Sequence, residues 1–467
     1  MSFSHQFEPT TLREYDIRGI VGKTLTSEDA FAIGRTFGSI VRRNGGKIMV
    51  VGYDGRLSSP MLEEALVQGA VECGLKIMRI GCGPTPMLYY ASVALQADGA
   101  IMVTGSHNPP DYNGFKMILA GKPFFGEQIR AMGQQSATGD VVPLEKGTLC
   151  DYSIREEYVC RLIQDYRGGD RQLKIVWDNG NSSAGQVLED LVVALPGEHE
   201  HIVLNAAIDG TFPAHHPDPT VAKNLAQLIS VVRDNKADLG IAFDGDADRI
   251  GVVDDKGQIL WGDQILILLA RDILKVHKEA TIIADVKASQ VLFDEVARAG
   301  GKPLMWKTGH SLIKSKMAET RAVLAGEMSG HIFFRDQWYG FDDALYAAVR
   351  VLDIVARMDE PLSVFRDSLP LTVSTPEIRF PCDDRRKFQV IQEIATRLEA
   401  EGADVSTIDG VRVNTPDGWW LLRASNTQAV LVARAEAKDS AGLERLKKAL
   451  VHHISHSGLE APNFDAS

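Results

Sequence analysis

The chain contains the stretch Ala100-Ile-Met-Val-Thr-Gly-Ser-His-Asn-Pro-Pro110, in which a short apolar run leads into a turn. The apolar run favours a strand in the interior of a sheet. Gly105 and the two prolines prevent a strand or a helix from continuing through the turn. Ser106 is therefore predicted to lie on a stiff bend at the end of a central strand, a position that suits a nucleophile. Taken by itself, a serine that bonds its own backbone in such a turn is the more common explanation.

Apolar runs that favour strands alternate with amphipathic helical stretches, which is the pattern of an α/β fold with a largely parallel sheet. Within this pattern a strand that ends at an aspartate occurs three times, and each is followed later by a second strand that feeds a polar loop with a glycine. Three copies of one unit would each place a functional loop at the carboxyl end of a strand, where ligands of open α/β sheets bind. The aspartates are Asp54, Asp178 and Asp285, and the loops are residues 104–110, 244–249 and 326–331.

The repeat predicts three related α/β domains with mixed sheets, followed by a different C-terminal part. After Thr372, short alternating strands accompany two helical stretches, which indicates a small α+β domain with an antiparallel sheet. The boundary between the second and third domains is placed at the turn Val253-Asp-Asp-Lys-Gly257. Residues 459–467 are expected to form a frayed tail. The predicted domains are residues 1–152, 153–254, 255–367 and 368–467.

The composition excludes several classes of protein. With 467 residues, 45% of them hydrophobic, the chain can bury more than one core. Its 62 acidic and 50 basic residues form no basic run or stripe, so a nucleic-acid partner is not expected. No signal peptide and no stretch of roughly 18 apolar residues is found, so we expect a cytoplasmic protein without a membrane partner. Five scattered cysteines without a CxxC pair indicate reduced thiols and argue against a zinc site.

The stretch Asp244-Gly-Asp-Ala-Asp-Arg249 follows an apolar run and carries three carboxylates at alternate positions. If they turn toward one point, each pair at about 4 Å repels by roughly 4 kcal/mol at an effective dielectric constant of about 20, so a cation is needed to hold them. Mg²⁺ suits the set, because it binds few carboxylates and keeps places for phosphate oxygens. A solvated acidic turn is the alternative interpretation. An EF-hand is excluded because Arg249 stands where the loop glycine belongs.

Two further loops carry groups that suit a phosphorylated sugar. Gly326-Glu-Met-Ser-Gly-His331 offers an acceptor, a hydroxyl and a histidine, the mixture that the neighbouring hydroxyls of a sugar require. Arg423-Ala-Ser-Asn-Thr-Gln428 offers a guanidinium, two hydroxyls and an amide, which suit a dianionic phosphate. Taken alone, the second pattern fits the capped start of a helix equally well.

These four loops, in this order, resemble the motifs of the α-D-phosphohexomutase superfamily, and those of the bacterial phosphomannomutase/phosphoglucomutase group most of all. Glu14-Tyr-Asp-Ile-Arg-Gly19 completes the set, which spans nearly the whole chain. The resemblance implies four domains around a central cleft. It also implies an isomerase that reversibly interconverts hexose 1-phosphate and hexose 6-phosphate, of mannose, glucose or both, through a phosphoserine enzyme and a 1,6-bisphosphate intermediate. Mg²⁺ is the implied cofactor and hexose 1,6-bisphosphate the implied activator.

The resemblance also implies roles for individual residues at the reacting centre. Ser106 is expected to carry the phosphoryl group. The metal ligands are expected to be Asp244, Asp246, Asp248 and a phosphate oxygen of phosphorylated Ser106. Because a phosphoserine carries about −1.5 to −2 charges, its place beside three carboxylates requires compensation by the metal and by Arg249. Transfer of a phosphoryl group needs alignment and neutralisation of charge, which these groups supply.

The remaining implied roles concern proton transfer and substrate binding. Lys116 matches the candidate general base of the family, and a lowered pKa is expected for it beside Mg²⁺ and an arginine. His310 matches a second proton carrier, and His107 a contact to the phosphate. The implied substrate-binding residues are Tyr15, Arg18, Lys287, His310, Glu327, Ser329, His331, Arg423, Ser425, Asn426 and Thr427.

Three alternatives remain beside this function. Phosphoglucosamine mutases of the same superfamily usually carry alanine in place of Gly105 and glutamine in place of Met328, and this chain departs from them at both positions. A phosphosugar-binding sensor would be favoured by loss of the nucleophile or a metal carboxylate, and none is lost. In a metal-dependent phosphatase, water would intercept phosphorylated Ser106. The expected partners are hexose phosphates, and the expected state is a monomer, with a dimer as the alternative.

Overall fold

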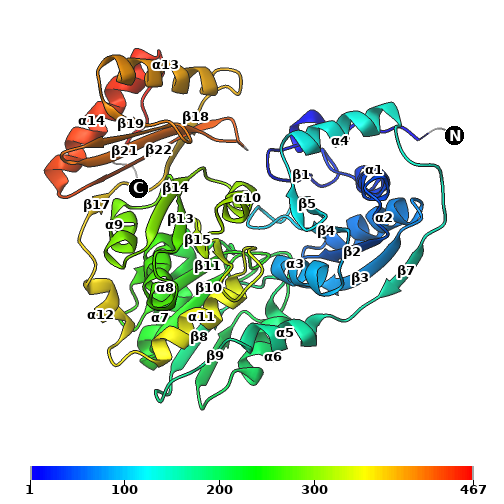
Figure 1. Ribbon diagram of the computed structural model, residues 1–467, viewed down its shortest axis with the longest axis horizontal. Helices are drawn as coiled ribbons and strands as arrows, with labels where there is room; N and C mark the ends of the chain where they lie inside the picture. Colours follow the sequence, from blue (N-terminus) through cyan, green and yellow to red (C-terminus); the bar gives the residue numbers. More distant parts are fainter. Residues whose placement is uncertain (1–2, 427, 465–467) are drawn as a thin grey trace.

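Four sheets, each packed with helices from the same part of the chain, form the molecule in the computed structural model, which describes residues 3–426 and 428–464. In Figure 1 the N-terminal domain (blue) lies at the right and the C-terminal domain (orange and red) at the upper left, with the second and third domains below and between them. None of the helices in this described part is long and apolar enough to cross a membrane.

The first sheet has the strand order β1-β5-β4-β2-β3-β7, with β6 paired to β5. Strands β2, β3, β4 and β7 are parallel, whereas β1 and β5 run antiparallel to their neighbours. The strand predicted from the apolar run before Ser106 is β4, in which every residue is buried. The bounds are β1 (Ile17–Ile20), β2 (Ile48–Tyr53), β3 (Lys76–Cys82), β4 (Gly99–Val103), β5 (Tyr112–Leu119), β6 (Lys122–Phe124), β7 (Thr148–Asp151), η1 (Pro9–Thr11), α1 (Ser27–Arg43), α2 (Ser59–Val71), α3 (Thr85–Ala94) and α4 (Glu127–Thr138).

The second and third sheets repeat part of this order. The orders β9-β8-β10-β11 and β14-β13-β15-β16 correspond to β3-β2-β4-β5, each with three parallel strands and an antiparallel fourth. The prediction of three related mixed-sheet domains is thus confirmed. The bounds are β8 (Lys174–Asp178), β9 (Glu200–Leu204), β10 (Leu239–Phe243), β11 (Ile250–Asp254), β12 (Ile259–Leu260), α5 (Arg155–Ile163), α6 (Gly185–Ala194), η2 (Ala222–Leu225) and α7 (Ala226–Asn235), then β13 (Thr281–Asp285), β14 (Lys302–Trp306), β15 (Leu324–Gly326), β16 (Ile332–Phe334), α8 (Gly262–Val276), α9 (Gln290–Arg298), α10 (His310–Thr320), α11 (Ala344–Ala356) and α12 (Leu362–Asp367).

The turn at the predicted boundary near residue 254 joins two strands of the second sheet. Strand β12 pairs antiparallel with β11, so it extends that sheet beyond residue 254. Asp254 closes the turn by accepting hydrogen bonds from the backbone N–H groups of Lys256 and Gln258. Polar residues with a glycine fit a hairpin turn as well as a linker. The four domain limits remain predictions.

The fourth sheet is antiparallel throughout, with the order β17-β22-β21-β20-β19 and β18 paired to β22. The prediction of a C-terminal α+β domain is confirmed. The expected frayed tail is wrong for its described part, because Leu459 and Phe464 pack against the core of this domain. The bounds are β17 (Val373–Ser374), β18 (Ile378–Pro381), β19 (Asp404–Ser406), β20 (Val411–Thr415), β21 (Gly418–Ala424), β22 (Val430–Ala437), α13 (Lys387–Ala400) and α14 (Ser440–His456).

The buried apolar residues show how the four domains are joined. One continuous cluster contains Met102, Trp177 and Leu345, and so runs through the first three domains. The C-terminal domain has a core of its own. It meets the third domain through a small apolar cluster of Val286, Trp419 and Leu421, and through polar contacts such as that of Arg412, whose Nη1 lies 2.6 Å from the carbonyl oxygen of Val286. The first three domains therefore form one packed body, and the fourth is attached to it.

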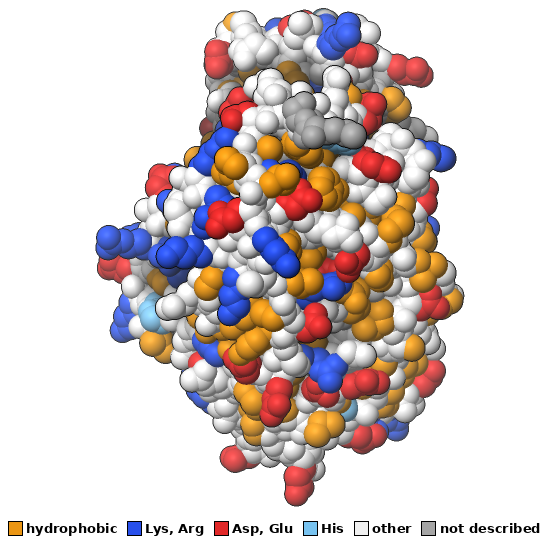
Figure 2. All heavy atoms as spheres, turned by 90° about the vertical axis from the view of Figure 1, so that its right-hand side faces the viewer, with side chains coloured by type: hydrophobic (Ala, Val, Ile, Leu, Met, Phe, Trp, Pro, Cys, Tyr) orange, Lys and Arg blue, Asp and Glu red, His pale blue; other side chains and the backbone are white. Residues whose placement is uncertain are grey.

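The charged side chains are mixed over the face at the right of Figure 1. In the view onto this face, acidic and basic side chains alternate among apolar ones (Figure 2). Neither sign of charge gathers into a broad field there.

Candidate active site

The three repeated aspartates lie buried at the ends of β2, β8 and β13, and two of them fix functional loops. Asp54 accepts a hydrogen bond from the backbone N–H of Gly105 at 3.0 Å, and Asp285 accepts one from Met328 at 3.2 Å. Asp178 instead lies 2.8 Å from the imidazole of His215. Sequence patterns located these aspartates only as the ends of strands, whereas the structure shows that Asp54 and Asp285 orient the loops beside them.

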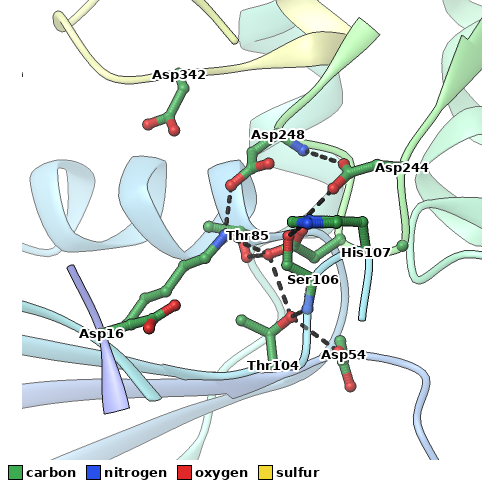
Figure 3. Close-up of polar contacts among 12 residues, drawn as sticks. Asp16, Asp54, Thr85, Thr104, Ser106, His107, Asp244, Asp248 and Asp342 are labelled. Atoms are coloured by element: carbon green, nitrogen blue, oxygen red, sulfur yellow. Dashed lines mark hydrogen bonds and ion pairs between the residues drawn. The ribbon is translucent and has the colours of Figure 1, made fainter. Parts of the chain in front are cut away.

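Ser106 lies in the left-handed region of backbone conformation, with a φ of 50°. A non-glycine residue is strained there, and such strain persists only where the surroundings hold it. Its backbone N–H donates to the hydroxyl of Thr104 at 2.9 Å. The Ser106 side chain is buried, with its Oγ 3.3 Å from Oδ2 of Asp244 and 3.1 Å from Nδ1 of His107 (Figure 3).

The carboxylates of Asp244, Asp246 and Asp248 are fully buried, and one oxygen of each lies within 4.8 Å of the other two. Burial, together with the charges of Asp248 and Asp246, holds the pKa of Asp244 well above its ordinary value. Oδ1 of Asp246 is buried and has no hydrogen-bond partner in the described part of the chain. A Cβ atom at Gly245 would lie 2.3 Å from the carbonyl oxygen of Ser106, so glycine lets the two loops meet. The donor set fits Mg²⁺, which prefers carboxylate oxygens.

Lys116 supplies positive charge to the carboxylates. Its Nζ lies 2.6 Å from Oδ2 of Asp246 and also pairs with Asp248. Burial alone would lower the pKa of Lys116, but Asp246 and Asp248 outweigh it and hold the pKa well above the ordinary value. The expectation of a lowered pKa is therefore wrong for this arrangement, because two carboxylates contact the ammonium group directly.

Thr85, the first residue of α3, connects the first domain to the loop of residues 244–249 in the second. Its backbone N–H donates to the carbonyl oxygen of Asp246 at 2.9 Å, and its hydroxyl donates to the carboxylate of the same residue. No local sequence pattern points to Thr85, since its partner lies 161 positions away. The prolines on both sides of it signalled only the start of a helix.

His331 connects the loop of residues 326–331 to the three carboxylates. Its Nε2 lies 3.2 Å from Oδ1 of Asp248, and its Nδ1 lies 2.9 Å from Oε2 of Glu327 and 2.9 Å from the hydroxyl of Ser329. Burial alone would lower the pKa of His331, but Asp248 and the hydrogen bond to Glu327 outweigh it and raise the pKa to about 9. Arg249 lies beside His331, with its Nε 3.3 Å from Nε2 of the imidazole.

His310 and His107 are held neutral instead. Burial, helped by the charge of Lys314, lowers the pKa of His310 well below its ordinary value, and burial with Arg249 does the same for His107. Nδ1 of His310 is buried and has no hydrogen-bond partner among the described residues. It therefore remains able to accept a proton.

Asp342 is a further buried carboxylate at the site, and it was not among the residues predicted from the sequence. Its Oδ1 lies 2.8 Å from Nζ of Lys314, and its Oδ2 lies 3.8 Å from Nδ1 of His310. Together with Asp248 and His331 it forms a second group of ligand atoms within 4.8 Å of one another. Figure 3 shows Asp342 beyond Asp248 as seen from Ser106. In the sequence Asp342 stands just before an apolar helix, where an aspartate normally indicates only a cap.

The predicted phosphate-binding residues lie on the other side of the histidines. The rings of His331 and His310 are 5.7 Å apart, and those of His310 and Tyr15 are 6.0 Å apart. The Tyr15 hydroxyl donates to the carbonyl oxygen of Thr308 at 2.8 Å and accepts a hydrogen bond from Nδ2 of Asn426 at 2.6 Å. Side chains of the first, third and fourth domains thus meet at Tyr15.

Other predicted binding residues are paired with protein groups. Arg423 donates from Nε to Asp409 at 2.9 Å, and the Ser425 hydroxyl accepts from the N–H of Gln428 at 3.2 Å. Further from this end, Arg18 donates to the side chain of Asn108 in the serine loop at 3.0 Å, and Lys287 donates to Glu377 at 2.9 Å. Thr427 lies outside the described residues.

Four family models match consecutive parts of the chain. They are described as phosphoglucomutase/phosphomannomutase alpha/beta/alpha domains I, II and III and C-terminal domain, and they match residues 9–140, 156–257, 261–372 and 377–453. The match therefore extends over most of the chain and over all of the loops described above.

Individual relatives are similar over nearly their whole length. The phosphomannomutase/phosphoglucomutase of Pseudomonas putida is 46% identical, with 93% of each chain covered. A phosphoglucomutase of Neisseria meningitidis serogroup A is 43% identical, with 93% of this chain and 94% of the relative covered. Among solved structures, a phosphoglucomutase/phosphomannomutase family protein from Burkholderia thailandensis superposes with a TM-score of 0.91 at 43% identity, with 98% of this chain and 99% of that chain covered.

Proposed function

We propose that this chain, which belongs to the phosphoglucomutase/phosphomannomutase family, interconverts the 1-phosphate and the 6-phosphate of mannose and of glucose. The observation that carries the proposal is the position of Oγ of Ser106, 3.3 Å from Asp244 in a buried cluster of three carboxylates. Such surroundings suit a hydroxyl that carries a phosphoryl group beside a cation.

The residues that would hold Mg²⁺ are Asp244, Asp246 and Asp248, together with a phosphate oxygen on Ser106. The buried Oδ1 of Asp246, which has no hydrogen-bond partner in the described chain, supports this assignment. When bound, the ion would neutralise the negative charge of the carboxylates and of the phosphoryl group. Lys116 and Arg249 add positive charge from the protein itself.

In the first step we propose that the bond between phosphorus and Oγ of Ser106 breaks while a bond forms to the free hydroxyl oxygen of the hexose monophosphate. The hydroxyl proton leaves to a base, and the product is the 1,6-bisphosphate. In the second step the bond between the other phosphorus and its sugar oxygen breaks while a bond forms to Oγ of Ser106, and the sugar oxygen takes up a proton from an acid, so that the isomeric monophosphate remains. Catalysis of this kind depends on alignment and on compensation of charge.

His310 and His331 are the proposed proton carriers. Their surroundings push their pKa values in opposite directions, which is typical of an acid and base pair. His310 is neutral, and its Nδ1 has no hydrogen-bond partner among the residues that the structure describes, so it is the proposed base in place of Lys116. His331, with a pKa of about 9, is the proposed acid.

The substrate has two ends, and the site offers a different set of groups to each. Ser106 faces the hydroxyl that receives or returns the phosphoryl group, while Arg423, Ser425 and Asn426 would bind the phosphate at the other end. Glu327 and Ser329 would bind the sugar hydroxyls in between. Since the bisphosphate must react at both of its phosphates, it would turn within the site, and hexose 1,6-bisphosphate added from solution would act as activator by loading Ser106.

The test is incubation of the purified protein with Mg²⁺, a trace of glucose 1,6-bisphosphate and, in separate reactions, the 1-phosphates of mannose, glucose and N-acetylglucosamine. Phosphorus NMR should show the 6-phosphates of mannose and glucose, with Ser106→Ala as the inactive control. Release of free phosphate would indicate a phosphatase, no change a sensor, and preference for N-acetylglucosamine a different sugar class.

A further inference from the structure

The turn after β2 contributes an arginine around which the serine loop is folded. Arg56 is buried, with 1% of its surface exposed. Its Nε donates to Oδ2 of Asp54 at 3.2 Å. Its two terminal nitrogens donate to four backbone carbonyl oxygens of one loop, those of Ser106 (2.7 Å), Asn108 (2.6 Å), Pro109 (2.5 Å) and Tyr112 (3.0 Å).

The guanidinium group uses all five of its N–H donors in these bonds. Four carbonyl oxygens that point at one place repel one another unless a cation lies between them. A lysine has three donors on one nitrogen and lacks the planar fork of arginine, so it cannot make the same five hydrogen bonds. One of the four carbonyls belongs to Ser106 itself, whose strained φ of 50° requires support from its surroundings.

The second domain packs against Arg56. The ring of Phe212 lies 5.3 Å from Cζ of Arg56, in a cation–π contact. A Cβ atom at Gly210 would lie 2.6 Å from Cα of Arg56, so the backbones of the two domains are close together. The second domain, which carries Asp244, Asp246 and Asp248, thus also packs against Arg56, around which the serine loop is folded.

We propose that Arg56 is a positioning residue that holds the side chain of Ser106 in place beside Asp244 for phosphoryl transfer. Arg56 acts through the backbone of the loop, and its bonds leave it no donor for a substrate. What the inference predicts for catalysis rests on the proposed function.

Arg35 provides a matched control, because it is also a buried arginine of the first domain, with 2% of its surface exposed. It donates to the carbonyl oxygens of Glu72 and Val142, and neither belongs to the serine loop. Arg35→Lys therefore removes a buried guanidinium of the same domain without touching Ser106. If Arg56 only stabilises the fold, the two lysine variants should behave alike.

The first measurement is amide hydrogen exchange of residues 105–112 without substrate, in the wild type, Arg56→Lys and Arg35→Lys. Local opening controls this exchange. We expect faster exchange in this segment by about 10-fold or more in Arg56→Lys alone. Unchanged exchange, or an equal rise in Arg35→Lys, would overturn the inference. This measurement decides the role of Arg56 even where the wild type fails to interconvert hexose phosphates.

The second measurement is steady-state kinetics with glucose 1-phosphate. A displaced nucleophile should lower kcat of Arg56→Lys on the order of 100-fold, with KM changed by less than about 3-fold. Arg35→Lys should keep kcat. Equal kcat values for the two variants would contradict the role. Should Arg56→Lys not fold, Arg56→Gln, which keeps an amide but loses the charge and most of the donors, takes its place in the same comparison with Arg35→Lys, and unchanged exchange of residues 105–112 in it would overturn the inference.

Discussion

Oγ of Ser106 lies 3.3 Å from Oδ2 of Asp244, although 138 positions separate the two residues in the chain. The contact joins the first domain to the second and places the proposed phosphoryl carrier against the proposed metal ligands. Burial and the neighbouring carboxylates hold the pKa of Asp244 well above its ordinary value, so the contact requires a cation to be favourable once Ser106 is phosphorylated.

Asp246→Asn should lower the rate of catalysis strongly and change the stability of the fold little. Removing one of three mutually repelling carboxylates relieves repulsion, although it also weakens the pair with Lys116. We expect kcat to fall on the order of 100-fold or more while the melting temperature stays within a few degrees of the wild type. Thermal unfolding in EDTA and kinetics in excess Mg²⁺ measure the two effects. If kcat and the melting temperature both fell strongly, the three carboxylates would instead have a structural role.

Lys116→Gln should destabilise the protein, because it leaves two buried carboxylates without their cation. Removal of one partner from a buried ion pair costs about 3 to 5 kcal/mol. We expect a loss of this size in the free energy of unfolding in EDTA and a smaller loss in Mg²⁺, since the ion binds the folded site. Lys278→Gln, at an exposed lysine, is the control. A loss that Mg²⁺ does not reduce would argue against a metal at these carboxylates.

Asp343→Asn should change the dependence of stability on pH. Asp343 is buried at the start of α11, where it accepts a hydrogen bond from the Tyr158 hydroxyl at 2.8 Å, and burial raises its pKa to about 7. Because the folded state binds this proton more tightly than the unfolded state, the contribution is complete below about pH 4 and is lost as pH rises through about 7.

The asparagine variant should therefore gain stability relative to the wild type between pH 5 and pH 8, by at most about 2.7 kcal/mol, which corresponds to the roughly two pH units between pH 5 and the folded pKa of about 7. Chemical denaturation at both pH values measures the difference. A constant difference between the two proteins across this range would show that Asp343 does not titrate there.

Arg423→Ala should raise KM for mannose 1-phosphate and glucose 1-phosphate alike, because the proposed contact is to the phosphate and not to the sugar. A lost charged hydrogen bond of this kind costs about 1.5 to 3 kcal/mol, or roughly 10- to 150-fold in KM. Arg445→Ala, at an exposed arginine of the same domain, is the control. An effect on one sugar alone would place Arg423 at the sugar hydroxyls.

The parts of the site that could be predicted from the sequence depend on local patterns. The apolar run before Ser106 forms β4, and the three aspartates of residues 244–248 converge because they follow a buried strand at alternate positions. The repeat of strand, aspartate and loop also emerged as three sheets with one strand order. In each case the residues from which the feature could be predicted are neighbours in the chain.

The parts that could not be predicted depend on partners far away in the chain. Thr85 gains its role only when the first two domains pack together, and Asp342 gains its ion pair from Lys314, 28 positions away in the same domain. The pKa of Lys116 depends on carboxylates 130 and 132 positions away. Arg56 belongs to a turn that in sequence indicated only the end of a strand, and its bonds to the serine loop span about 50 residues.

Phosphorylation of Ser106 by the intermediate is the most direct test of the account. The dephosphorylated protein is incubated with glucose 1,6-bisphosphate and Mg²⁺, and its intact mass is measured before and after addition of excess glucose 1-phosphate. We predict the gain of one phosphoryl group, located on Ser106 by peptide mapping, absent in Ser106→Ala and returned to the sugar when the monophosphate is added. A protein that stays unmodified, or that carries the phosphoryl group on another residue, would contradict the account.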